Sequence, residues 1–180
     1  MRLELDALAQ LGVRPVAPSA GVLFLCTHNS ARSILAEAVL NHIGQGRFKG
    51  FSAGSSPRDN QQPNPLGLQT LEAAGIATDG LRSKSWDEFA RPDAPHMDLV
   101  ITVCDNAAGE ACPFWPGHPA TAHWGYADPS AHPGSDDDRR EAFRQTLHAI
   151  RRRLELLVNL PPESLDKLAL QQRAREMAAS

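Results

Sequence analysis

Short apolar runs alternate with stretches of helical periodicity along most of the chain. Apolar runs bounded by turn-forming residues predict buried strands, and they occur at 21–26, 47–54, 98–103 and, more weakly, 121–124. Apolar residues that recur at helical spacing predict helices, and these fall at 30–43, 64–74, 136–160 and 164–179. Strands that alternate with helices favour a parallel sheet with right-handed crossovers.

Capping residues agree with several of these boundaries. Ser30 is the predicted N-cap of the helix at 30–43, Gly44 is its stop, and Gly75 ends the next helix. The long helix begins in the acidic turn Asp136–Asp138, which complements the helix dipole. Its predicted buried stripe consists of Phe143, Leu147, Ile150, Leu154 and Leu157.

We therefore predict an α/β fold with three layers, in which a central four-stranded parallel sheet has helices on both faces. The chain divides into an N-terminal extension with a short helix, a main domain and a C-terminal helical extension, at 1–20, 21–160 and 161–180. Ligands of such sheets bind beyond the carboxyl ends of the strands. Cys26, Cys104 and Trp124 lie at or just after predicted strand ends, so we expect the functional site there.

Composition narrows the class of protein. The 180 residues are 42% hydrophobic and carry a net charge of -3, which favours a globular core and argues against a surface that coats nucleic acid. No apolar run is long enough to cross a membrane, and the N-terminus lacks the order of a signal peptide. Three cysteines are too few for a disulfide scaffold. We expect a cytoplasmic protein with reduced thiols, and neither a nucleic acid nor a membrane as its partner.

The segment from Cys26 to Ser33 joins the first strand to the first helix of the main domain. A short loop at this place can direct successive backbone N–H groups at one tetrahedral oxyanion, and the positive end of the helix adds to the attraction. Arg32 can close over the anion with a bidentate fork. The same field is expected to lower the pKa of Cys26 and make its sulfur a nucleophile. The predicted oxyanion-binding residues are Thr27, His28, Asn29, Ser30, Ala31, Arg32 and Ser33.

Two residue types suit this loop in particular. Asn29 tolerates the left-handed backbone conformation that such a loop needs, and Ser33 is placed to donate a hydrogen bond to the thiolate. The alternative is an inert buried Cys26, because an arginine at this distance from a cysteine often arises by chance in an arginine-rich chain. The placement between a strand and a helix favours the functional interpretation.

The run Val22–Ser33, continued by Ala36 and Glu37, resembles the signature of the low-molecular-weight tyrosine phosphatases and of the arsenate reductases derived from their fold. Phe51–Gly54, at the end of the second predicted strand, resembles the same superfamily. The resemblance covers roughly residues 21–160 and implies that this range is a catalytic domain with the three-layer fold of that superfamily.

Asp128 is the candidate general acid. It follows the weak fourth strand within the segment His123–Pro129, where a loop carboxyl group can supply the proton that a leaving oxygen needs. For this role it must stay protonated near neutral pH. A simple Asp-Pro turn is the alternative, but the Asp-Pro of the superfamily matches this position.

Cys104 and Cys112 separate the possible activities. Their segment resembles the part of thioredoxin-coupled arsenate reductases that carries two further redox cysteines, which phosphatases do not need. The resemblance implies a relay: Cys26 attacks arsenate, Cys104 forms a disulfide with Cys26 and releases arsenite, and Cys112 then takes over the disulfide. No bound cofactor is expected. An external thiol reductant completes the cycle, and three placed cysteines favour thioredoxin over glutathione and glutaredoxin.

Two other functions stay open at this point. One is a low-molecular-weight protein tyrosine phosphatase that hydrolyses phosphate monoesters through Cys26, Arg32 and Asp128. Relatives that act on phosphotyrosine carry aromatic residues after the acid, whereas Ser130 and Ala131 stand here, which favours the reductase. The other is a redox or oxyanion sensor without turnover.

No metal site is predicted, because short Cys-Cys or His-His ligand spacings do not occur in the sequence. Some relatives in the superfamily bind potassium near the loop. Asn29, Glu37 and Ser52 suit three of those ligand positions, but Ser85 stands where an aspartate is expected. This departure argues against a bound potassium ion.

Overall fold

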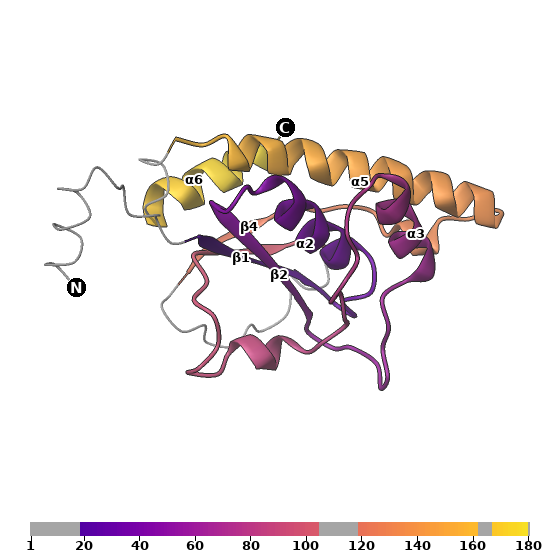
Figure 1. Cartoon of the computed structure of the whole chain (residues 1–180), viewed down its shortest axis with the longest axis horizontal. Coiled ribbons are helices and arrows are strands. Elements are labelled where there is room, and N and C mark those ends of the chain that lie inside the picture. The colour runs from indigo at the N-terminus through magenta and orange to yellow at the C-terminus, as the bar shows by residue number, and fades with distance from the viewer. Residues whose placement is uncertain (1–18, 105–118, 162–166, 180) are drawn as a thin grey trace, which may run out of the picture.

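The computed structural model describes residues 19–104, 119–161 and 167–179. Its centre is a four-stranded sheet made of β1 (Ala20–Cys26), β2 (Phe48–Gly54), β3 (Leu99–Thr102) and β4 (Ala120–His123). All neighbouring strands run parallel, in the order β2-β1-β3-β4 (Figure 1). The predicted four-stranded parallel sheet is confirmed, and each strand boundary lies within one residue of its predicted place.

The strand β1 lies inside the sheet, with a neighbouring strand on each side. It contributes side chains to both halves of the hydrophobic core, one on each face of the sheet. Successive side chains of a strand point to opposite faces of the sheet. Val22 and Phe24 accordingly pack in the cluster beneath the helices, whereas Leu23 and Leu25 pack in the cluster on the other face. All four side chains are fully buried, which explains the uninterrupted apolar run in the sequence.

Helices cover one face of the sheet, and the described ones are α2 (Arg32–Ile43), α3 (Pro65–Ala73), α5 (Asp136–Val158) and α6 (Lys167–Met177). They lie together on the same side in Figure 1 and share one hydrophobic cluster. In the described part of the chain, the other face is covered by the short 3₁₀-helix η1 (Trp86–Phe89) and the segment after it. The three-layer arrangement predicted from the sequence is therefore confirmed.

Helix α5 begins as predicted. Ser135 is its N-cap and forms a capping box with Asp138, which satisfies the backbone N–H groups of these two residues. The predicted stripe of buried residues is also confirmed, since the buried side chains of α5 are Phe143, Leu147, Ile150, Leu154 and Leu157.

The start of α2 differs from the prediction. The helix begins at Arg32 with Ala31 as its N-cap, and no side chain caps it among the described residues. Ser30 is therefore not the N-cap, because it still belongs to the preceding loop, where its carbonyl oxygen accepts a hydrogen bond from the Asn64 N–H at 2.8 Å. The uncapped N–H groups of α2 remain free for an anion.

Helix α6 packs against the edge of the sheet. The indole N–H of Trp124, just after β4, donates to the Ala174 carbonyl oxygen at 2.8 Å, and both side chains are buried. The predicted N-terminal helix lies outside the described residues, and the predicted domain boundaries stay predictions. None of the helices in the described ranges combines the length and the apolar character that a membrane crossing requires.

Candidate active site

Cys26 is the last residue of β1, and only 4% of its surface is exposed. The residues from Cys26 to Arg32, here called the Cys26 loop, lead directly into α2. The backbone N–H of Asn29 donates a hydrogen bond to the Cys26 sulfur. A buried sulfur thus lies inside a loop that turns around it and next to the uncapped start of a helix.

Asn29 shapes the loop. Its φ of 56° lies in the left-handed region, as predicted. Its side-chain amide donates to Ser33 Oγ at 2.8 Å and accepts from the backbone N–H of Lys84 at 3.0 Å. Its carbonyl oxygen accepts from Ser83 Oγ at 2.6 Å. Asn29 is fully buried, and these hydrogen bonds hold its backbone in the left-handed conformation, which is unfavourable for most residues.

Gly54 supports the loop from below because it has no side chain. A Cβ atom at this position would lie 2.7 Å from the Thr27 carbonyl oxygen and 3.0 Å from the Asn29 nitrogen. Both neighbours are backbone atoms, so any larger residue would displace the Cys26 loop. This contact gives a physical reason for the glycine at the end of β2.

Arg32 is the first residue of α2 and turns toward the segment that follows β4. Its Nη1 donates to the Tyr126 carbonyl oxygen at 2.9 Å, and its Nη2 lies 3.8 Å from Asp128 Oδ2. Its Nε is buried and has no hydrogen-bond partner among the described residues. The guanidinium is therefore fixed in place and keeps a donor for an additional acceptor.

Asp128 is placed next to Arg32 by a short 3₁₀-helix, η2 (Pro129–Ala131), of which it is the N-cap. Its Oδ1 accepts from the backbone N–H of Ser130 at 3.0 Å and from Ser130 Oγ at 2.7 Å. The other oxygen, Oδ2, faces Arg32, and the side chain is 37% exposed. A carboxyl group with one fixed and one available oxygen is suited to proton transfer beside the arginine.

Cys104 follows β3 and is brought against the Cys26 loop. Its sulfur lies 3.6 Å from Thr27 Oγ1 and within hydrogen-bonding range of Cys26. Cys104 is 2% exposed, and both cysteines are free thiols. The parallel pairing of β1 with β3 explains this contact, because it brings the carboxyl ends of the two strands to the same edge of the sheet.

The pKa of Cys26 differs from the prediction. It is raised rather than lowered, first by the hydrogen bond with Cys104, then by burial and by the charge of Cys104. Arg32 and the Asn29 N–H lower it, as predicted, but do not dominate. Two thiols in contact cannot both ionise easily, because their charges repel in a buried place. The relay implied by the resemblance already brings Cys104 to Cys26, but the pKa prediction considered only the Cys26 loop and left out the effect of Cys104.

Three predicted site residues remain, of which two lie in the described part of the chain and one does not. His28 is half-buried, and its Nδ1 lies 2.9 Å from the Ser56 carbonyl oxygen, which fixes the ring next to the end of β2. Ser33 is fully buried in the first turn of α2, held by Asn29. Cys112 lies outside the described residues.

Comparison with known proteins places this site in a family. Residues 21–172 match the family described as low molecular weight phosphotyrosine protein phosphatase. The chain belongs to this family.

Relatives within the family include arsenate reductases. An arsenate reductase from Bacillus licheniformis is 33% identical over 136 residues, which is 74% of this chain and 91% of that protein. An arsenate reductase from Bacillus subtilis is 31% identical over 134 residues, with 74% and 91% of the two chains covered.

Solved structures show the same similarity. An arsenate reductase in the phosphate binding state shares 26% identity and a TM-score of 0.59, covering 77% of this chain and 96% of that chain. A thioredoxin-dependent arsenate reductase from Corynebacterium glutamicum shares 25% identity and a TM-score of 0.51, covering 86% and 70%. A tyrosine phosphatase from Erwinia amylovora, at 18% identity and a TM-score of 0.57, shares the fold.

Three residues near the site of this family member were not predicted to have a part in it. Ser83 and Lys84 hold Asn29, and Tyr126 offers its carbonyl oxygen to Arg32. Ser83 and Lys84 reach the Cys26 loop from a segment far along the chain, and no local motif marks them. Tyr126 stands two residues before Asp128 in the segment that was assigned to the general acid, which is the one signal that pointed to it.

Proposed function

We propose that this protein reduces arsenate to arsenite, with Cys26 as the nucleophile and Cys104 as the second thiol. The observation that supports the proposal most is the contact of two free, buried thiols beside the Cys26 loop. Ester hydrolysis in this fold needs one thiol, whereas reduction by thiols needs a second one to carry two electrons away. The named relatives agree with this chemistry.

The oxyanion binds in the Cys26 loop. The backbone N–H groups of the loop and the uncapped start of α2 supply donors and a positive end. Arg32 adds a full positive charge, and its Nε keeps a donor that no described residue uses. Its contacts to Tyr126 and Asp128 hold the guanidinium at the rim of the loop.

In the first step, Cys26 passes its proton to the bound arsenate, its sulfur attacks arsenic to form a sulfur–arsenic bond, and one arsenic–oxygen bond breaks. Asp128 donates the proton with which that oxygen leaves as water. Its Oδ2 faces the arginine that holds the oxyanion. Arsenic stays in its pentavalent state in this step, so no reduction has yet occurred.

In the second step, Cys104 attacks the Cys26 sulfur. A sulfur–sulfur bond forms, the sulfur–arsenic bond breaks, and its electron pair stays with arsenic. Arsenic is thereby reduced by two electrons and leaves as arsenite, while the two thiols are oxidised to one disulfide. The contact between Cys104, Thr27 and Cys26 supports this geometry.

Cys112 then attacks Cys104 and takes over the disulfide, which leaves Cys26 reduced for another cycle. An external thiol reductant must finally reduce the Cys104–Cys112 disulfide, and we propose thioredoxin. A thioredoxin-dependent arsenate reductase is among the similar solved structures. The cytoplasm is the proposed location, because thiols are kept reduced there.

Single Cys→Ser variants, assayed for arsenate reduction with thioredoxin and for aryl phosphate hydrolysis, test the proposal. Cys26→Ser should abolish both activities, since the nucleophile is lost. Cys104→Ser and Cys112→Ser should stop multiple-turnover reduction, by about 10³-fold or more, and leave any hydrolysis intact.

Hydrolysis serves as the internal control for an intact Cys26 loop. Equal loss of both activities in Cys104→Ser, or undiminished reduction, would count against the relay. A wild-type protein that binds arsenate but shows no turnover with any thiol reductant would instead support a sensor.

A further inference from the structure

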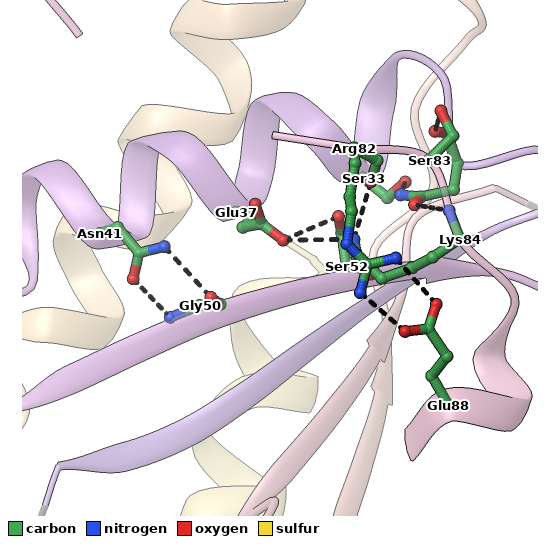
Figure 2. A network of polar contacts seen from close by, with 10 residues as sticks. Ser33, Glu37, Asn41, Gly50, Ser52, Arg82, Ser83, Lys84 and Glu88 are labelled. Atoms are coloured by element: carbon green, nitrogen blue, oxygen red, sulfur yellow. Dashed lines mark hydrogen bonds and ion pairs between the residues drawn. The ribbon is translucent and has the colours of Figure 1, made fainter. Parts of the chain in front are cut away.

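A buried ion pair lies beside the Cys26 loop, outside the residues assigned to the reaction. Lys84 Nζ is 3.8 Å from Glu37 Oε1, and the two side chains are only 7% and 13% exposed. Figure 2 shows the two side chains meeting between α2 and β2. Lysine is rarely buried to this extent unless its charge is compensated, so the contacts around its ammonium group need an explanation.

The ammonium group is surrounded by oxygen atoms. Lys84 Nζ donates to the carbonyl oxygens of Ser52 and Arg82, both at 2.8 Å. These two hydrogen bonds use two of the three ammonium protons, and Glu37 adds an ion pair at 3.8 Å. Ser52 Oγ also donates to Glu37 Oε1 at 3.0 Å. A carboxylate and two carbonyl oxygens around one positive charge form the kind of cage that a free monovalent cation would occupy.

Glu37 and Ser52 also stand at two of the positions that, by the family resemblance, suit potassium ligands. In the structure their oxygen atoms face an ammonium group, which already supplies the positive charge. The residues present therefore do not fit a free cation at this place. The chain supplies the charge itself.

The same lysine is connected to the catalytic cysteine. The backbone N–H of Lys84 donates to Asn29 Oδ1 at 3.0 Å, and its carbonyl oxygen accepts from the Gly54 N–H at 2.8 Å. Asn29 in turn donates its backbone N–H to the Cys26 sulfur. Lys84 thus joins α2, β2 and the Cys26 loop through its side chain and its backbone.

Burial disfavours the charged form of both side chains, and the opposite charge of the partner offsets this effect in each case. Burial raises the pKa of Glu37, and Lys84 lowers it. Burial lowers the pKa of Lys84, and Glu37 raises it. Loss of the ammonium group would leave the Glu37 carboxylate and two carbonyl oxygens without their positive partner.

We propose that Lys84 is a positioning residue whose ammonium group is a built-in cation: it holds the Cys26 loop in its anion-binding conformation through Asn29 and makes a free potassium ion unnecessary. The inference rests on the proposed oxyanion chemistry at Cys26. An open groove of about 690 Å³, lined by Glu37, Lys49 and Lys84 among others, reaches the pair from the surface. A small cation can therefore enter once the lysine side chain is shortened.

Lys84→Ala, assayed for arsenate reduction in choline, potassium and ammonium chloride at equal ionic strength, tests this. In choline chloride we expect kcat/KM to fall by about 10- to 100-fold, as for other losses of support to a binding site. Potassium or ammonium should restore activity at least several-fold, because either ion fits the vacated cage, and should leave the wild type unchanged. Glu37→Gln combined with Lys84→Ala should remove the rescue.

Two variants sharpen the test. Lys49→Ala, which removes an exposed lysine of the same groove, should behave as the wild type in every salt. Lys84→Met keeps most of the side-chain volume without the charge, so it should lose activity and resist rescue, and it carries the test if Lys84→Ala does not fold. Full activity of both Lys84 variants in choline chloride, or potassium stimulation of the wild type, would overturn the proposal.

A readout without turnover separates this inference from the proposed function. Bound phosphate should protect Cys26 from alkylation, and this protection should depend on potassium in Lys84→Ala but not in the wild type. If the wild type reduces no arsenate but shows this pattern, the reductase assignment fails and the role of Lys84 stands. Protection of Lys84→Ala that is equal in choline and potassium chloride counts against Lys84.

Discussion

Cys26 and Cys104 behave as one unit rather than as a nucleophile and a bystander. Their hydrogen bond is the largest cause of the raised pKa of Cys26, ahead of burial. Arg32 and the Asn29 N–H act in the opposite direction. The pair is therefore poised for sulfur–sulfur bond formation, and a permanently ionised Cys26 is not needed.

Replacing Cys104 by alanine should lower the pKa of Cys26, because the hydrogen bond and the charge that raise it are both lost. The Cys26 thiolate would then form at lower pH, and alkylation of Cys26 near pH 7 should be roughly tenfold faster. The pH profile of iodoacetamide labelling, followed on the Cys26 peptide by mass spectrometry, measures this. A profile that is unchanged or moves to higher pH would show that Cys104 does not retain the proton on Cys26.

At the residue scale, the sequence was informative where the chemistry is local. The left-handed conformation of Asn29 and the placement of Arg32 at the start of a helix follow from residue types along one short segment. The Cys104 contact and the role of Lys84 depend on strand order and on side chains from three elements. No local pattern contains that information: the approach of Cys104 to Cys26 was implied only by the family resemblance, and the predicted direction of the Cys26 pKa was wrong because it left this contact out.

At the scale of elements, α6 supports the segment that carries Asp128, the proposed general acid. The indole N–H of Trp124 donates to the Ala174 carbonyl oxygen of α6, and the backbone N–H of Trp124 donates to the Thr102 carbonyl oxygen at 2.8 Å. Two residues later, the ring of Tyr126 stacks on Arg153 of α5, at 4.9 Å. The segment between β4 and η2 is thus held by both C-terminal helices.

Trp124→Phe should lower the free energy of unfolding by about 2 kcal/mol, from a lost buried hydrogen bond and some lost volume. Urea unfolding followed by circular dichroism measures this. Leu156→Ala is the matched control, because Leu156 is exposed on α5 and 47% accessible; its effect should stay within about 0.5 kcal/mol. Equal stability of the two variants would mean that α6 does not stabilise the segment.

Regular elements could be predicted because burial imposes a period on the sequence. The buried stripe of α5 follows a helical period, whereas β1 and β3 were recognised as short, continuous apolar runs. The two short 3₁₀-helices, η1 and η2, were not predicted, since a single turn is too short to show a repeating pattern of buried positions. Ser30 was wrongly taken as an N-cap, because a serine before an apolar run is typical of capped helices, whereas this helix starts uncapped beside the anion site.

At the scale of the whole molecule, the parallel sheet explains why the site exists. The strands β1, β3 and β4 deliver Cys26, Cys104 and Asp128 to one edge, and the end of β2 delivers Gly54 beneath the loop. The fold therefore gathers the proposed nucleophile, the second thiol and the proposed proton donor from segments that lie far apart in the sequence. The proposed function requires that electrons pass from arsenic-bound Cys26 and from Cys104 to arsenic, so that the two thiols end as one disulfide.

The most direct test is to trap that transfer. The Cys112→Ser variant, treated with arsenate and without external reductant, should stop after one turnover with one arsenite released per protein. Non-reducing peptide mass spectrometry should then find a disulfide between Cys26 and Cys104, which their contact allows without a large movement. Arsenite release without this disulfide, or no release although arsenate binds, would contradict the account.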